Sequence, residues 1–170
     1  VGEAGVRVRP PERPRECTGI FKFMSSGSSS EKPLPAVIRQ IAADLHNEKR
    51  KGGKVAVVAG PAVVHTGAAG SLASLIRDGY VDVLLSGNAL AVHDAEADLL
   101  KTSLGVRLGE GIADAKGTRN HIVAINEVYK AGGLKAAVEK GVIRSGIIYE
   151  CVKKGVPFVL AGSIRDDGPL

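Results

Sequence analysis

Three short apolar runs interrupt an otherwise mixed pattern of apolar and polar positions along this chain of 170 residues. The first run, residues 54–61, has the length and β-branched content of a strand buried on both faces of a sheet. Residues 81–85 and 156–160 predict two further strands, the last of them of the same buried type. Pro157 is acceptable there because it stands near the start of its strand.

Between and around these runs, apolar residues recur at helical spacing. The predicted helices cover residues 34–51, 66–78 and 89–100, then a helix that starts after Thr118 or Asn120 and runs to residue 131, and residues 145–154, with a shorter helical turn or two at 134–140. Gly79 and Gly155 are the expected helix ends, and Thr118 or Asn120 is the expected cap of the fourth helix. Residues 102–117 carry four glycines and little periodicity, which predicts a long surface loop.

Alternating strands and helices predict an α/β fold, a parallel sheet with flanking helices. Residues 1–30 are rich in proline, arginine and serine and have no periodicity, which favours a lead-in or linker from a preceding domain. The sequence therefore predicts one α/β domain over residues 31–170, continuing beyond the C-terminus of this chain.

Composition narrows the classes of function. The net charge is +5 and the pI about 9.3, but basic residues are dispersed except near residues 49–54, and aromatics make up only 4%. Neither nucleic acid nor a membrane is therefore an expected partner, since base-stacking platforms and apolar spans of about 20 residues are both missing from the sequence. Cys17 and Cys151 form no disulfide framework and no metal-like spacing, so we expect a reducing cytoplasm and no metal.

The three predicted strands end alike, on a small residue, a glycine and then a polar residue or proline. These ends are residues 58–61, 85–88 and 160–163, with Gly60, Gly87 and Gly162 as the glycines. Parallel strands place their carboxyl ends at one sheet edge, where ligands bind, and glycine there allows close approach to a ligand. We therefore expect an anionic or nucleotide-like ligand, although each glycine alone fits ordinary turn chemistry. No GxGxxG or P-loop pattern is present.

Several polar residues are candidates for chemistry. His65 lies just past the first strand, and an imidazole is a proton shuttle near neutral pH. His93 and Asp94 lie within a predicted helix, where a solvated polar face is the alternative because Glu96 and Asp98 follow.

Further candidates follow the last strand. Arg165 suits a carboxylate or phosphate, and Asp166 and Asp167 suit ribose hydroxyls or an amino group, with a solvated turn as the alternative. Cys151 is interpreted as a core residue rather than a nucleophile, because no histidine neighbours it in sequence.

Six motifs together resemble a known family. They are CTGIFKFMSSGSSSEKP (17–33), VAVVAGPAVVHTGAAG (55–70), GYVDVLLSGNALAVHD (79–94), TSLGV (102–106), RNHIVAINEV (119–128) and IIYECVKKGVPFVLAGSIRDDGPL (147–170). In order and spacing they resemble the conserved region of the lysine-oxoglutarate reductase/saccharopine dehydrogenase bifunctional-enzyme family. That family includes archaeal ornithine cyclodeaminases and the cyclodeaminase half of cyanobacterial arginine dihydrolases.

The resemblance implies a Rossmann-like, deoxyhypusine-synthase-like domain that binds NAD. It implies conversion of ornithine to proline and ammonia, with a hydride removed to NAD⁺ and later returned to the cyclic imine. Expected cofactor contacts, including the first strand's end, are Gly60, Pro61, Gly87, Asn88, Ala89, Asn120, His121, Gly162, Ser163, Ile164, Arg165 and Asp166. For proton transfer or amine recognition the candidates are His65, Asp94 and Asp167.

Two alternatives remain open at this point. One is a nucleotide-binding module without turnover, and the other is an NAD-dependent oxidoreductase acting on lysine or saccharopine. Ornithine and lysine differ by one methylene, which changes binding by only about 1–3 kcal/mol. A small amino-acid substrate and a homo-oligomeric assembly are expected in either enzymatic case.

Overall fold

The structure is a computed structural model, and it describes residues 34–103, 106–107, 119–162 and 170. The chain divides into two compact units, Val1–Asp44 and Leu45–Leu170. The domain boundary predicted after residue 30 stays a prediction. None of the helices among the described residues is long and apolar enough to cross a membrane.

Helix α1, Leu34–Arg50, confirms the first predicted helix. Leu34, Val37, Ile38 and Ile41 are exposed, and no residue of the helix is buried. Near its end, the Lys49 ammonium lies 2.9 Å from a carboxylate oxygen of Asp82. Together with the Val55 N–H and Lys54, this contact holds the pKa of Asp82 far below its usual range. The C-terminal end of α1 is thereby tied to the segments on either side of the first strand.

The sheet of the second unit consists of β1 (Ala56–Ala59), β2 (Val83–Ser86) and β5 (Phe158–Leu160). All three strands are parallel, in the order β1-β2-β5. The sequence prediction of three parallel strands is confirmed.

Among its described residues, the second unit has six helices that begin after β1. They are α2 (Ala62–His65), α3 (Ala69–Arg77), α4 (Asn88–Leu100), α5 (Asn120–Ala131), α6 (Leu134–Glu139) and α7 (Ile147–Lys154). The helix predicted over residues 66–78 is wrong at its start, because Gly67 at φ 80° separates a short α2 from α3. Gly79 and Gly155 end their helices as predicted, at φ 79° and 68°.

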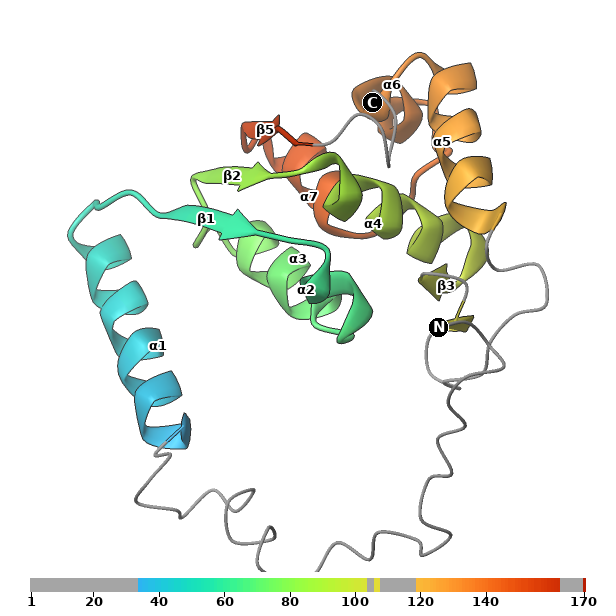
Figure 1. Cartoon of the computed structure of the whole chain (residues 1–170). Helices are drawn as coiled ribbons and strands as arrows, with labels where there is room; N and C mark the ends of the chain where they lie inside the picture. The colour runs from blue at the N-terminus through green and yellow to red at the C-terminus, as the bar shows by residue number, and fades with distance from the viewer. Residues whose placement is uncertain (1–33, 104–105, 108–118, 163–169) are drawn as a thin grey trace, which may run out of the picture. The chain divides into compact units, whose positions relative to one another are not determined.

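Helices α3, α4 and α7 lie on one side of the sheet, whereas α5 packs against α4, and α6 packs against α5 and α7 (Figure 1). The chain steps from β1 to β2 to β5 in a single direction, and right-handed crossovers in one direction place their helices on one side. The core between the layers contains fully buried Ile76, Leu84, Leu90, Ile147 and Ile148.

The prediction of strands buried on both faces is wrong, because the opposite face of the sheet is exposed. Val58, Leu85 and Val159 are neighbours in register across the three strands. They are 79%, 39% and 55% exposed. An apolar composition predicted burial on both faces, but within the described residues helices cover only one.

The long loop predicted over residues 102–117 is also corrected at its start. β3 (Thr102–Ser103) pairs antiparallel with β4 (Val106–Arg107). Thr118, one predicted cap, lies outside the described residues. Asn120, the other, is wrong as a cap, because Arg119 holds the cap position and the Asn120 amide bonds Thr102 instead.

Candidate functional site

The carboxyl ends of the three parallel strands meet at one edge of the sheet. Ala59, Ser86 and Leu160 stand in register there. The Ser86 hydroxyl donates a 2.7 Å hydrogen bond to the Ala59 carbonyl, and the Ala161 N–H donates one of 2.8 Å to the Ser86 carbonyl. These bonds fix the spacing of the edge where the sequence places a ligand.

Two glycines at this edge allow β2 and β5 to approach each other. A Cβ on Gly87 would lie 2.9 Å from the carbonyl oxygen of Ala161, which is too close for any side chain. Gly162 has φ 129°, a conformation that residues with side chains rarely adopt. The close contact between the strand ends thus explains why glycine is found at both positions.

Gly60 differs from these two. A Cβ there would meet nothing within 4 Å, and its φ is not in the positive range. Its neighbour Pro61 precedes α2 and accepts hydrogen bonds from the N–H groups of Val64 and His65. The surface beside Gly60 is therefore open space at the end of β1.

Helix α4 begins at the same edge. Its cap residue, Gly87, is extended and has no side chain to pair with the first N–H groups of the helix. Asn88, the first helical residue, is buried, and Ala89 is half-buried. Unpaired N–H groups at the start of a helix attract anionic groups such as phosphate.

His65 lies at the end of α2, where two other elements reach its ring. Its Nδ1 lies 2.7 Å from the hydroxyl oxygen of Ser103 on β3. The His93 ring of α4 meets it edge to face, with 4.7 Å between ring centroids. Burial, and then the charge of His93, lower the pKa of His65, while the charge of Glu96 raises it. The lowered pKa favours a neutral imidazole, the form that accepts a proton.

A buried polar network continues from His93. Its Nδ1 lies 2.9 Å from Oε2 of Glu96, which is fully buried. The Thr102 hydroxyl donates to Oε1 of Glu96 at 2.7 Å, and the Asn120 amide donates to that hydroxyl at 2.9 Å. The structure thus connects His65 and Asn120, two predicted site residues, through α4 and β3. His121, next along α5, is half-buried.

The solvated face considered for His93 and Asp94 is wrong. Both side chains and Glu96 are buried, at 5%, 2% and 0% exposed. The physical reason is that α4 lies among α2, α5 and α7, so polar residues on several of its sides face other helices.

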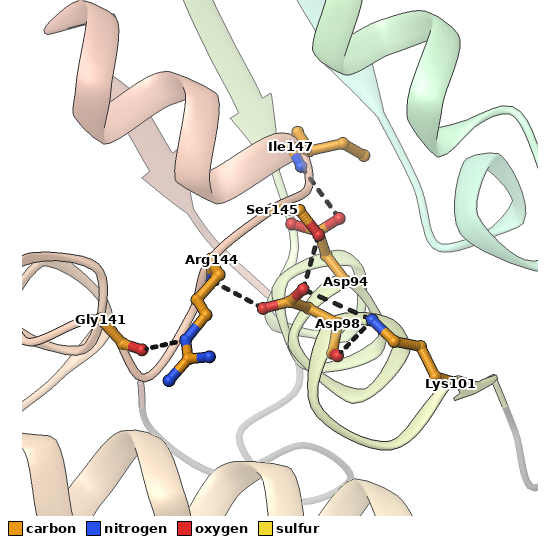
Figure 2. Close-up of polar contacts among 7 residues, drawn as sticks. All are labelled: Asp94, Asp98, Lys101, Gly141, Arg144, Ser145 and Ile147. Carbon is orange, nitrogen blue, oxygen red and sulfur yellow. Dashed lines mark hydrogen bonds and ion pairs between the residues drawn. The ribbon is translucent and has the colours of Figure 1, made fainter.

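Asp94 contacts the start of α7 rather than the sheet edge (Figure 2). Its two oxygens accept hydrogen bonds from the N–H groups of Ile147, at 3.0 Å, and Ile148, at 2.8 Å. Burial raises the pKa of Asp94 to about 6, against the lowering effect of these bonds. These are the contacts of a helix cap, and a catalytic role for Asp94 stays a prediction.

One turn further along α4, Asp98 holds the segment that leads into α7 (Figure 2). Its carboxylate accepts hydrogen bonds from the Arg144 N–H and the Ser145 hydroxyl. Asp94 and Asp98 together fasten the α6–α7 connection to α4.

Five predicted site residues lie outside the described residues. They are Ser163, Ile164, Arg165, Asp166 and Asp167. Their contacts with cofactor or substrate stay predictions.

Cys151 is confirmed as a core residue. It is fully buried on α7, and burial raises the pKa of its thiol to about 12. Thiolate chemistry at this position is therefore strongly disfavoured.

Sequence reasoning did not identify Glu96, Thr102 or Ser103 as part of the site. Glu96 was interpreted as a sign of a solvated helix face. Thr102 and Ser103 stand in the TSLGV motif, which carried the family resemblance without a role for either residue. The TSLGV motif was the one sequence feature that could have pointed to Thr102 and Ser103 as site residues.

A parallel sheet with helical crossovers and a glycine-rich carboxyl edge defines a Rossmann-type α/β domain, a class of nucleotide-binding folds. The model of the Rossmann-fold part of the ArgZ-like arginine dihydrolase C-terminal region matches residues 39–170. The model of the first part of that region matches residues 1–38. The chain belongs to the family of ArgZ-like arginine dihydrolase C-terminal regions.

Relatives with known names agree with this membership. An ornithine cyclodeaminase of Archaeoglobus fulgidus is 60% identical over all 170 residues, and the match spans 42% of that protein. The solved ternary complex of AgrE with ornithine and NAD⁺ is 52% identical, with a TM-score of 0.78 over 84% of this chain and 21% of AgrE. A conserved LOR/SDH protein from Methanococcus maripaludis is 48% identical, with a TM-score of 0.77 over 100% of this chain and 52% of that protein.

These comparisons confirm the resemblance predicted from the motifs. They also show that the chain spans about two fifths of the length of the archaeal relatives it matches, 42% in the Archaeoglobus protein.

Proposed function

We propose that this chain is the cofactor-binding and proton-transferring part of an NAD-dependent ornithine cyclodeaminase, which converts ornithine to proline and ammonia. The observation that carries the proposal is the sheet edge, where the three strand ends and the start of α4 come together, and from which α4 runs on to place His93 against His65. Support among relatives comes from AgrE, which has been solved with ornithine and NAD⁺.

The residues at this edge fit a dinucleotide. Open space at Gly60 leaves room for a ligand beside the backbone, and the uncapped start of α4 at Gly87 suits a pyrophosphate. Asn88 brings an amide group to the start of α4, and Asn120 brings one to the start of α5, where it donates to Thr102. We propose that these residues hold NAD, which when bound supplies a hydride acceptor and donor.

The protein's own groups supply position and proton transfer. An amino group must be unprotonated before its carbon loses a hydride, because the nitrogen lone pair forms the imine. His65, whose pKa is lowered by burial, is the proposed acceptor of that ammonium proton. The neutral imidazole it presents is the form this step needs.

The direct test is a reaction with ornithine labelled with deuterium on its α-carbon, in the presence of NAD⁺. We expect proline and ammonia in equal amounts, no net NADH, and proline that retains the deuterium at the same carbon. Lysine in a parallel reaction tests substrate choice. Binding of NAD⁺ without proline would favour a binding module, and net NADH would favour an amino-acid oxidoreductase.

A matched pair of substitutions tests the role of His65. We expect His65→Asn to lower kcat by roughly 100-fold or more, the usual effect of losing a general base. His46→Asn is the control, since His46 is exposed on α1 and bonds only Tyr80 among the described residues. Equal activity in the two variants would refute the assignment of His65.

A further inference from the structure

His65 does not stand alone: a second, buried histidine supports it. The two rings meet at an interplanar angle of 63° with 4.7 Å between centroids. His93 is 5% exposed and Glu96 is fully buried, so neither exchanges freely with solvent. Burying polar groups such as the His93 imidazole and the Glu96 carboxylate costs free energy. Their position behind the half-exposed His65 ring therefore calls for an explanation beyond packing.

The chemistry of the donors fixes the direction of each hydrogen bond. An amide nitrogen only donates, so the Thr102 hydroxyl accepts from Asn120 and gives its own hydrogen to Oε1 of Glu96. A carboxylate oxygen only accepts, so the hydrogen between Glu96 and His93 lies on Nδ1 of His93. Glu96 thereby holds the ring of His93 in one orientation beside the ring of His65.

From this arrangement we propose that His93, held by Glu96, is a positioning residue that orients the His65 imidazole and keeps it available as a proton acceptor. The inference rests on the proposed function for what His65 acts on, although not for the geometry itself. Neither His93 nor Glu96 needs to touch substrate.

The charges around His65 give the two supporting residues opposite effects. Among the described residues, the titratable groups that act on His65 are His93 and Glu96 of α4, while Ser103 of β3 is an uncharged partner. Positive charge on His93 lowers the pKa of His65, and negative charge on Glu96 raises it. Removing one or the other must therefore move the pKa of His65 in opposite directions.

The test is an NMR titration of the four histidine side chains in this chain. In the unsubstituted chain we expect a hydrogen on Nδ1 of His93 and a His65 pKa below that of an exposed histidine. A bare Nδ1 on His93 would overturn the proposal without any substitution.

Two conservative variants then separate positioning from packing. His93→Gln retains a donor for Glu96 and should raise the pKa of His65, whereas Glu96→Gln retains the Thr102 bond and should lower it further. Glu127→Gln is the control, because Glu127 pairs with Lys130 on the surface of α5 and should leave the titration unchanged. Identical shifts, or none, in the two variants would overturn the proposal.

Catalysis provides an independent measurement. We expect His93→Gln to lower kcat by roughly 10- to 100-fold, as supporting residues around reactive imidazoles do, and to move the acidic limb of the pH profile with the measured His65 pKa. If the unsubstituted chain is inactive but His93→Gln and Glu96→Gln shift the pKa of His65 in opposite directions, only the cyclodeaminase proposal is refuted. An active parent whose pH profile ignores both substitutions would refute the positioning proposal alone.

Discussion

Single glycines at the sheet edge serve different purposes, although their sequence contexts are alike. Gly87 and Gly162 let two strand ends touch, which is a requirement of the fold. Gly60 has no such requirement, since space and an ordinary backbone conformation surround it. A glycine that the fold does not need is better explained by something that binds beside it.

The contrast between these glycines predicts different results for Gly60→Ala and Gly87→Ala. We expect Gly60→Ala to keep the unfolding free energy within about 0.5 kcal/mol and to weaken NAD⁺ binding. We expect Gly87→Ala to lower stability by about 1–3 kcal/mol, because its Cβ would meet the Ala161 carbonyl at 2.9 Å. Urea denaturation and calorimetric titration with NAD⁺ measure both effects. Unchanged NAD⁺ affinity in Gly60→Ala would place the cofactor elsewhere.

Gly146 supplies a second prediction at this scale. It has φ 108°, and a Cβ there would lie 2.6 Å from an oxygen of Asp94. We expect Gly146→Ala to lower the free energy of unfolding by about 2–4 kcal/mol, as strain and displacement of a buried cap combine. Gly155→Ala is the control, since it shares a positive φ of 68° but has open space around it. A similar loss in both variants would mean that the Asp94 contact adds nothing.

Helices and strands followed from the sequence far better than their surroundings did. Periodicity and glycine stops located α4 and α7 because they are local properties of the chain. The burial of α4 depends on helices distant in sequence, so the polar residues His93 and Glu96 resembled a solvated face. The strand ends could be predicted as a site because each is a local sequence pattern. The Glu96–Thr102 bond could not, because it depends on how α4 and β3 pack in the folded chain.

The contact of Asp94 on α4 with the first N–H groups of α7 predicts that the stability of the chain depends on pH. Asp94 has a pKa of about 6 in the folded chain and an ordinary, lower value near 3.9 when unfolded. The folded state therefore holds this proton more tightly, and its contribution is fully present below the unfolded pKa and lost as pH rises through about 6. We expect the stability of the unsubstituted chain relative to Asp94→Asn to fall over this window and to stay constant above it. Thermal unfolding from pH 3.5 to 8 measures the difference. A flat difference would mean that Asp94 ionises normally.

At the scale of the whole molecule, the main feature is the sheet face that the described residues of the second unit leave uncovered. Parallel sheets are ordinarily covered on both faces, yet Val58, Leu85 and Val159 form an exposed apolar row. The Archaeoglobus relative has further polypeptide, since this chain matches 42% of it. We propose that such additional polypeptide covers this face in the longer proteins. The expected homo-oligomer stays a prediction.

Two adjacent leucines of β2 test this arrangement, because they point to opposite faces of the sheet. Leu84 is fully buried against the helices, whereas Leu85 is 39% exposed. In this chain we expect Leu84→Ala to cost about 2–5 kcal/mol of unfolding free energy and Leu85→Ala less than about 1 kcal/mol. In a longer protein whose added segment covers the open face, Leu85→Ala should approach the cost of Leu84→Ala. Urea denaturation of both variants in both lengths measures this, and an unchanged, small cost for Leu85→Ala in the longer protein would show that the face stays open there.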